Sequence, residues 1–339
     1  MSARPLVSVV MVNWNGAQHL RICLPSLREQ SYEALEIIVV DNASSDDSEA
    51  AARNFDVRWL PLEQNIGLAP ALNRGAEIAA GEFLLFVNND MRFDREFVAE
   101  LVAPMISDRA IFATDAKQYF WDGSGPGHSA CRLRKGRTAA ANETELVPGL
   151  YFAQQNEQQN TEVFLASAAC MLARKANFAA LKGFDGRLPL GYEDVEICWR
   201  AWLHGWKIVY APKAICWHRV GSSGKSPEGA RYNFRGVLTG RLLFATKLLP
   251  WRYALQTWGV SIAGLAKDVS RRQWAIAADR LRILARIGGL GVRLLTEKRE
   301  LFGTFHSSSE KHLNFLLQLA NGRDELIDGS SGTGRAARG

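Results

Sequence analysis

The stretch LLFVNND at residues 84–90 ends an apolar run with three side chains that carry oxygen atoms. Asp90 is a carboxylate of the kind that binds Mg²⁺ or Mn²⁺, and Asn88 and Asn89 offer amide oxygens and amide donors. Because one carboxylate binds such an ion weakly, the phosphates of a substrate would have to complete its coordination. The alternative is that the three residues only form a turn after a strand, which Asn and Asp favour.

The elements that must position this motif are strands that alternate with helices. Apolar, β-branched runs predict strands at residues 7–12, 36–41, 57–60 and 82–87, with helical segments between them. This alternation predicts an α/β fold with a mostly parallel, Rossmann-like central sheet whose faces are covered by helices. In such sheets, ligands bind at the carboxyl ends of the strands.

Polar residues follow all four predicted strands at that edge. They are Asn13 and Asn15 after the first strand, Asp41 and Asn42 after the second, Glu63, Gln64, Asn65 and Gly67 after the third, and Asn88, Asn89 and Asp90 after the fourth. At any single strand a turn is the better explanation, because Asx residues form turns readily. Four consecutive strands that end in this way favour a ligand site.

The second half of the chain has a different pattern. Residues 121–160 are rich in Gly, Ser, Asn and Gln, which predicts a long surface loop or a lid. Trp199, Trp202 and Trp206 lie at helical spacing, which favours packing in the core over binding a sugar. After Arg231 the chain is mainly helical, basic and amphipathic through about residue 300.

Composition and charge limit the classes of protein. No two of the five cysteines have CxxC spacing, which predicts reduced thiols in a cytosolic protein. We find no signal peptide and no run of about 18 uncharged apolar residues, so a spanning helix is not expected. The net charge of +6 is uneven, because residues 231–300 carry 14 Lys or Arg and 4 Asp or Glu. These helices could lie on an anionic membrane, form a homodimer or pack as ordinary solvated helices. Nucleic acid is not an expected partner, since no recognition module is present.

Four segments, in this order and spacing, carry a resemblance to a known family. They are VSVVMVNWNG, EIIVVDNASSDDS, NIGLAPALNRGAEIAAGEFLLFVNND and GYEDVEICWR. The set resembles the family 2 glycosyltransferases with the GT-A fold, and WHRVGSSG with RYNFRG resembles their rhamnosyltransferase-like branch. The resemblance covers about residues 5–245. It implies a nucleotide-diphosphate sugar as donor and a hydroxyl group as acceptor.

The resemblance also implies roles for the residues at the sheet edge. Asp41 takes the position that contacts the nucleobase, Asn13 lies beside the nucleoside, and Asn65 and Gly67 border the same pocket. The family's metal motif is usually Asp-x-Asp, whereas this chain has two asparagines before its aspartate. Asp90 is therefore the only carboxylate of the motif that can bind the metal.

The remaining site residues follow from the same comparison of motifs. Asn88 and Asn89 are expected at the ribose or the phosphates, and His218 matches a position where a histidine joins the metal, Mn²⁺ or Mg²⁺. We expect Lys225 or Arg231 to add positive charge at the diphosphate, from a glycine-rich loop that could close over it.

The acidic pair that opens the segment EDVEICWR supplies the candidate base. The family's base maps to Asp194, and Glu193 would orient the acceptor or the start of the helix. The alternative is helix capping, because carboxylates in a first turn interact favourably with the helix dipole. A single base with no nucleophile implies one direct displacement, with inversion at the anomeric carbon.

We therefore expect a catalytic domain at 1–235, a basic helical region at 236–320 and a disordered tail at 328–339. The expected function is transfer of a sugar, plausibly rhamnose, to a glycan or lipid-linked acceptor in cell-surface polysaccharide synthesis. The expected location is the cytoplasm, with contact to the inner face of the plasma membrane left open. A sugar nucleotidyltransferase is the first alternative, but the segment after the first strand lacks a lysine-rich phosphate loop. A non-catalytic nucleotide-sugar-binding scaffold is the second alternative, and a dehydrogenase is excluded because GxGxxG is absent.

Overall fold

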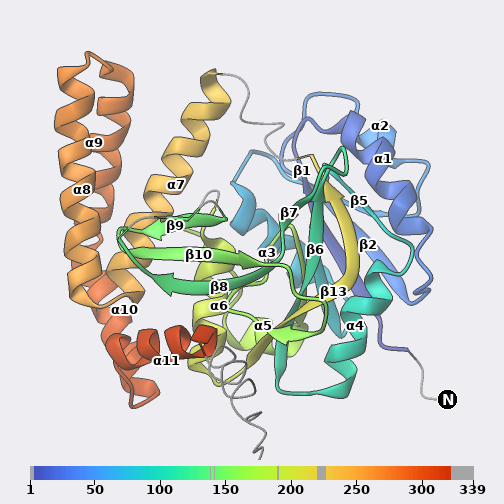
Figure 1. The fold of residues 1–339 in the computed structure, drawn as a ribbon. Helices are drawn as coiled ribbons and strands as arrows, with labels where there is room; N and C mark the ends of the chain where they lie inside the picture. The colour runs from blue at the N-terminus through green and yellow to red at the C-terminus, as the bar shows by residue number, and fades with distance from the viewer. Residues whose placement is uncertain (1–3, 138, 141, 189–190, 220–226, 322–339) are drawn as a thin grey trace, which may run out of the picture.

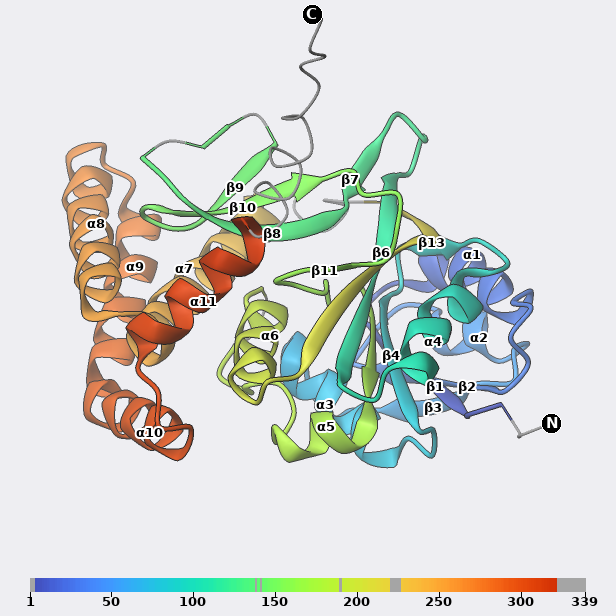
Figure 2. The same ribbon diagram turned by 60° about the horizontal axis from the view of Figure 1, so that its bottom comes forward.

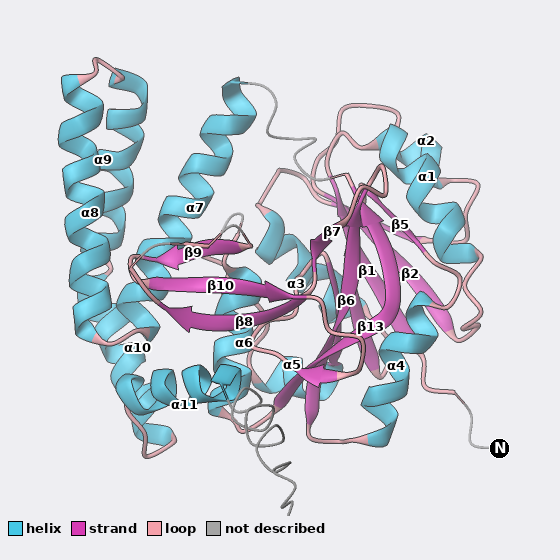
Figure 3. Cartoon of the chain, viewed as in Figure 1, coloured by secondary structure: helices cyan, strands magenta, loops and turns pink. Residues whose placement is uncertain are grey.

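The computed structural model describes residues 4–137, 139–140, 142–188, 191–219 and 227–321. Figure 1 shows a large central sheet with helices on both faces, a second small sheet beside it, and a C-terminal group of helices. Figure 3 shows that the strands belong to the first two parts, whereas the C-terminal part is entirely helical where it is described. The predicted α/β architecture with a helical C-terminal region is confirmed.

The central sheet contains both parallel and antiparallel pairs, and most neighbouring strands in its order are parallel. Its order is β11-β13-β6-β12-β4-β1-β2-β3, and β5 and β7 pair with β13 and β6. Strand β1 is parallel to β2 and β4, β2 is parallel to β3, and β6 is parallel to β13, whereas β12 runs antiparallel between β4 and β6. The bounds are β1 Val7–Asn13, β2 Leu35–Asp41, β3 Arg58–Pro61, β4 Phe83–Asn88, β5 Met91–Phe93, β6 Ile111–Phe120, β7 Pro126–His128, β11 Thr161–Glu162, β12 Cys170–Arg174 and β13 Lys207–His218.

Helices cover both faces of this sheet, because the strands are apolar on both sides. Val9 and Met11 face a core shared with α1, α2 and α4, whereas Val10 faces a core shared with α3, α5 and α6. The bounds are α1 Ala17–Arg28, α2 Ser48–Ala52, α3 Leu68–Ile78, α4 Phe97–Ser107, α5 Lys175–Ala180 and α6 Glu193–Leu203. The expected core positions of Trp199 and Trp202 are confirmed, since both are buried. All five cysteines are buried and unpaired.

The expected loop or lid at residues 121–160 is wrong. The segment forms β7 and an antiparallel three-stranded sheet of order β8-β10-β9, with β8 Ala130–Lys135, β9 Glu143–Val147 and β10 Leu150–Gln155. Buried apolar residues are spread thinly through it, such as Leu133, Leu146 and Leu150, and polar turn residues outnumber them. The composition therefore hid short strands whose stability comes from packing against other elements.

The C-terminal helices pack onto the catalytic core. Their bounds are α7 Pro227–Leu248, α8 Trp251–Ser270, α9 Trp274–Gly289, α10 Gly291–Thr304 and α11 Ser309–Asn321. Helix α7 runs through residue 235, where the catalytic domain was expected to end, and its Phe244 packs edge-on against Trp199 at 5.3 Å between ring centroids. In the described part of the chain, no helix is long and apolar enough to cross a membrane. The tail expected to be disordered, 328–339, lies outside the described residues.

Candidate active site

The ends of β1 and β2 are joined by buried side chains. Asn13 donates from Nδ2 to Asp41 Oδ1 at 3.1 Å and to Ser44 Oγ at 3.2 Å. The other carboxylate oxygen of Asp41 accepts a hydrogen bond from the backbone N–H of Ser44 at 3.1 Å. Both Asn13 and Asp41 are almost fully buried, so these bonds hold them rigidly. The two residues predicted to contact the nucleoside thus lie together at one edge of the sheet.

The loop after β3 is hydrogen-bonded to the residue that follows β2. Asn42 donates to Asn65 Oδ1 at 3.0 Å and accepts from the backbone N–H of Ile66 at 2.9 Å. Asn65 Oδ1 also accepts from the backbone N–H of Gly67 at 3.0 Å. Gly67 has a φ of 88°, which only glycine adopts without strain. This position requires a glycine for the shape of the backbone as well as for access to a ligand.

The asparagines after β4 connect this edge to two other strands. Asn89 donates to Asn13 Oδ1 at 2.8 Å, and the amide nitrogen of Asn88 lies 3.3 Å from His218 Nε2. A Cβ atom at Gly16 would lie 2.3 Å from Asn89 Nδ2 and 2.4 Å from Asn13 Oδ1. Gly16 is therefore part of the site, although the sequence analysis did not single it out; the glycine in NWNG was its only signal.

Asp90 and His218 are brought together from different strands. Nε2 of His218 lies 3.2 Å from Asp90 Oδ1, and Nδ1 lies 3.2 Å from Gln118 Oε1. Gln118 on β6 was not predicted, but it orients the imidazole ring. No cluster of three or more His, Cys, Asp or Glu side chains suited to a metal ion occurs among the described residues. A carboxylate and an imidazole are nevertheless a donor set that suits Mn²⁺.

The acidic pair opens α6, directly after Tyr192, whose backbone is left-handed with a φ of 70°. Asp194 Oδ1 accepts from the backbone N–H of Val195 at 2.8 Å, and its Oδ2 accepts from that of Ala168 at 3.3 Å. Glu193 is buried, and its Oε2 has no hydrogen-bond partner in the described part of the chain. Burial and the charge of Asp194 raise the pKa of Glu193 to about 8, so Glu193 keeps its proton at neutral pH.

Asp194 differs from Glu193 in its surroundings. Burial also raises the pKa of Asp194, but its two backbone hydrogen bonds and the neighbouring His128 act in the opposite direction. Two adjacent carboxyl groups whose environments differ in this way can divide the roles of base and hydrogen-bond donor.

A second buried pair, which the sequence analysis missed, lies beside Asp194. Asp115 on β6 is fully buried, and its Oδ2 lies 2.7 Å from Nε2 of His128 on β7. Asp115 Oδ1 accepts a hydrogen bond from the backbone N–H of Ser167 at 3.1 Å. The next residue is Ala168, whose backbone N–H donates to Asp194. Burial lowers the pKa of His128, but the charge and hydrogen bond of Asp115 outweigh it and raise that pKa above its ordinary value. No sequence motif marks this pair, because the two residues meet only through the pairing of β6 with β7.

The structure does not support both expected phosphate-binding cations. Lys225 lies outside the described residues, and Arg231 forms an ion pair with Asp279 on α9. Arg219 lies beside the motif, since its backbone N–H donates to the carbonyl oxygen of Asp90 at 3.0 Å. Its guanidinium group lies over the ring of Trp121, 4.5 Å from the centroid. Stacking of this kind holds a guanidinium group in place while leaving its edge free to bind an anion.

Comparison with known proteins agrees with this geometry. The model of the family "Glycosyl transferase family 2" matches residues 8–180. An N-acetylglucosaminyl-diphospho-decaprenol L-rhamnosyltransferase of Mycobacterium tuberculosis is 27% identical over 244 residues, which are 66% of this chain and 79% of the relative. A poly-beta-1,6-N-acetyl-D-glucosamine synthase of Staphylococcus epidermidis is 24% identical over 220 residues, 63% of this chain and 50% of the relative.

The fold also matches a solved structure. The crystal structure of GalNAc-T7 with UDP, GalNAc and Mn²⁺ superimposes with a TM-score of 0.58 at 19% identity, covering 74% of this chain and 49% of that one. The fold and the family match define a glycosyltransferase of the GT-A class. The chain belongs to glycosyl transferase family 2, as its motifs predicted. Neither the nucleotidyltransferase nor the scaffold alternative is favoured by these relatives.

Proposed function

We propose that this protein is an inverting glycosyltransferase that moves a sugar from a nucleotide-diphosphate donor to a hydroxyl of a glycan or lipid-linked acceptor. The observation that carries the proposal is the acidic pair at the start of α6, where Glu193 is buried and Asp194 is held by the backbone amides of Ala168 and Val195. The name of the mycobacterial relative supports rhamnose as the sugar and a lipid-linked diphosphate sugar as the acceptor. Both relatives support a role in making cell-surface polysaccharide.

The donor would bind along the polar edge of the sheet. Asp41 would accept a hydrogen bond from the nucleobase, with Asn13 beside the nucleoside and Asn65 and Gly67 at the border of the same pocket. The bonds from Asn13 to Asp41 and from Asn42 to Asn65 support this assignment, because they hold the polar groups in place before a ligand arrives. Asn88 and Asn89 would contact the ribose or the phosphates.

Asp90 and His218 would hold a divalent metal ion, Mn²⁺ or Mg²⁺. Their 3.2 Å separation brings an oxygen and a nitrogen donor together, and the donor's phosphates would complete the shell. Imidazole favours Mn²⁺ over Mg²⁺. When bound, the ion supplies positive charge that stabilises the departing diphosphate. Arg219, stacked on Trp121, is better placed than Arg231 to add to this charge.

Asp194 would take the proton of the acceptor hydroxyl as that oxygen attacks the anomeric carbon. Its hydrogen bonds to the amides of Ala168 and Val195 orient the carboxylate. Glu193, held neutral, would donate a hydrogen bond to the acceptor. A single base without a covalent nucleophile requires direct displacement, so the product has inverted configuration.

The C-terminal helices would contact a membrane surface. Helix α8 carries an exposed apolar stripe formed by Trp251, Leu255, Ile262 and Val269. On a helix, positions 251, 255, 262 and 269 share one face. Exposed apolar residues beside basic ones are typical of helices that lie on anionic lipid. A homodimer through the same stripe is the competing arrangement.

One experiment tests the donor side of this proposal. The melting temperature of the full chain would be measured with UDP-, dTDP- and GDP-sugars, each with and without Mn²⁺. Because ligands stabilise the state that binds them, at least one donor should raise the melting temperature in a metal-dependent way. If no donor produces such a shift, the proposal is wrong.

A further inference from the structure

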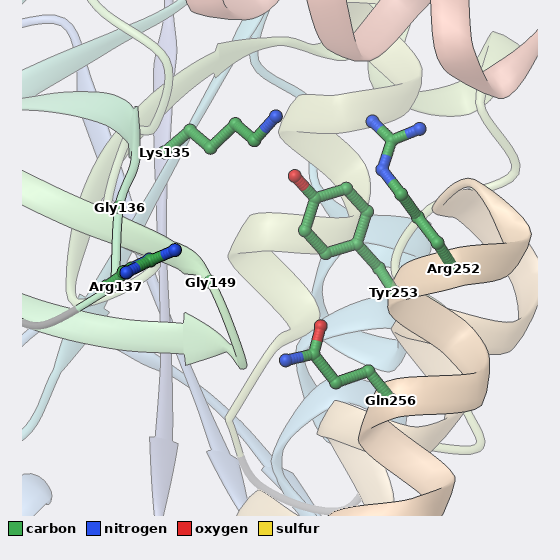
Figure 4. Close-up of a pocket in the computed structure, with 7 residues that line it drawn as sticks. All are labelled: Lys135, Gly136, Arg137, Gly149, Arg252, Tyr253 and Gln256. Carbon is green, nitrogen blue, oxygen red and sulfur yellow. The ribbon is translucent and has the colours of Figure 1, made fainter.

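A cleft separates the three-stranded sheet from the start of α8. Its volume of about 550 Å³ is in the range of ligand-binding sites. Figure 4 shows Lys135, Arg137 and Gly149 on the sheet side, facing Arg252, Tyr253 and Gln256 on α8.

The lining of this cleft is strongly cationic. It contains three basic side chains and no acidic one. Arg252 is paired with Glu310 at 2.7 Å and lies over the ring of Tyr253, 4.9 Å from the centroid, so its position is fixed. Lys135 and Arg137 are exposed, and neither forms an ion pair within the described ranges of the chain. Two positive charges are therefore left without a counter-charge and face the same space.

The face of α8 next to the one that lines the cleft carries exposed apolar side chains. Trp251 is 54% exposed and Leu255 is 67% exposed, and each directly precedes a residue of the cleft, Arg252 and Gln256. Residues 251 and 255 begin the exposed apolar stripe of α8. A molecule that used both features would carry an anionic group next to a long apolar chain.

The sheet that forms one wall of the cleft is tied to the acidic pair. The hydroxyl of Tyr192, two residues before Asp194, donates to the carbonyl oxygen of Leu146 on β9. Arg241 strengthens this junction, because it bonds Tyr192 Oη at 3.3 Å and the carbonyl oxygen of Glu145 at 3.2 Å. Gly149, in the turn that follows β9, lines the cleft. One wall of the cleft is thus hydrogen-bonded to the segment that carries the acidic pair.

We propose that this cleft binds the phosphate head group of an amphiphile, with Lys135, Arg137 and Arg252 as the binding cations and Trp251 and Leu255 against the apolar chain. Two sources share this chemistry, an anionic phospholipid of a bilayer and a lipid-linked sugar phosphate. The second source rests on the proposed function, since that molecule would be the acceptor.

Vesicle sedimentation of the full chain, without any donor, tests the proposal. Three kinds of vesicle are compared: phosphatidylcholine alone, phosphatidylcholine with phosphatidylglycerol, and phosphatidylcholine with a few per cent of a polyprenyl diphosphate. The double variant K135A/R137A removes the free cations of the cleft. The matched control R109A/K213A removes one arginine and one lysine that are also exposed, but that lie outside α8, before β6 and on β13.

We expect K135A/R137A to bind phosphate-bearing vesicles roughly 30-fold more weakly than the unaltered chain, and the control to bind about threefold more weakly or less. If the unaltered chain binds polyprenyl diphosphate vesicles more tightly than phosphatidylglycerol vesicles of equal charge, the occupant of the cleft is the lipid-linked acceptor. If it binds both equally, the occupant is a bilayer phospholipid. An equal loss in both variants, no loss in either, or association of the chain with itself instead of with vesicles would overturn the proposal. The binding assay needs no sugar transfer, so its failure is distinct from a failure of donor binding.

Discussion

The carboxylate of Asp90 lies 3.2 Å from the imidazole Nε2 of His218, although Asp90 follows β4 and His218 is the last residue of β13. The pairing of β5 with β13 sets Met91 opposite His218 and so brings the two side chains together. Gln118 holds the far side of the imidazole ring. It is on this contact that the proposed metal site rests, since the motif has one aspartate in place of the usual two.

Asp90→Asn should remove the metal-dependent part of donor binding. The amide keeps the shape of the carboxylate but not its charge, which a divalent ion requires. The rise in melting temperature that Mn²⁺ adds in the presence of a donor should disappear, while the metal-free melting temperature changes little. Asp56→Asn, at an exposed site, is the control. A metal-dependent shift of full size in Asp90→Asn would contradict the metal assignment.

Asp194→Asn should bind donor normally and lower the rate of transfer by roughly 10²- to 10⁴-fold, the usual contribution of a positioned base. Asparagine can still accept the amide hydrogen bond of Ala168, so the site should keep its shape. Initial rates of sugar transfer and the donor-induced thermal shift would be measured on the same preparation. Transfer at nearly the original rate would rule out Asp194 as the base.

The free energy of unfolding should fall as the pH rises toward 8, because the buried Glu193 then loses its proton. Its pKa is raised to about 8 in the folded state, so the folded state binds the proton more tightly than the unfolded chain does. Stability is therefore lost between the ordinary glutamate pKa and about 8. Glu193→Gln cannot ionise, so its stability should not decline over this range. Above pH 8, the free energy of unfolding of this variant should exceed that of the original protein by roughly a few kcal/mol.

Urea unfolding at several pH values measures this difference. A control variant, Glu77→Gln, changes an exposed glutamate on α3 and should leave the pH profile unaltered. Identical profiles for Glu193→Gln and the original protein would show that Glu193 is ionised at neutral pH.

Asp115→Ala should lower the free energy of unfolding by about 3–5 kcal/mol, the usual effect of breaking a buried pair. The change leaves His128 and the backbone N–H of Ser167 without their buried acceptor. Because the next amide, Ala168, orients Asp194, transfer should also be slower in the fraction that is folded. Urea unfolding measures the stability, with the exposed Asp122→Ala as a control that should unfold like the original chain. An unchanged midpoint for Asp115→Ala would refute the structural role.

Gly16→Ala should weaken donor binding without unfolding the protein. The added methyl group would lie 2.3 Å from Asn89 Nδ2 and 2.4 Å from Asn13 Oδ1, so both side chains must move. Gly125→Ala, where a Cβ atom would meet nothing within 4 Å, is the matched control. The donor-induced thermal shift should fall in the first variant and persist in the second. An equal shift in both would show that these asparagines do not contact the donor.

The strands and the polar edge of the sheet could be predicted from the sequence by itself. Buried parallel strands are continuous apolar runs, so LLFVNND and its three counterparts mark both the strand and the point where it ends. Parallel strands that alternate with helices place these ends on one edge, which is why Asn13, Asp41 and Asn88 could be grouped before any coordinates were known.

Only the tertiary structure decided which distant residues meet. Arg231 lies next to the glycine-rich segment in sequence, yet the packing of α7 on α9 pairs it with Asp279. The strands within 121–160 form because Leu146 and Leu150 find a core supplied by other elements, which no local pattern reveals. The Asp115–His128 pair and the cationic cleft against α8 depend in the same way on contacts between segments far apart in the chain. Local sequence carries periodicity and turn chemistry, whereas long-range pairing depends on the packing of the whole chain.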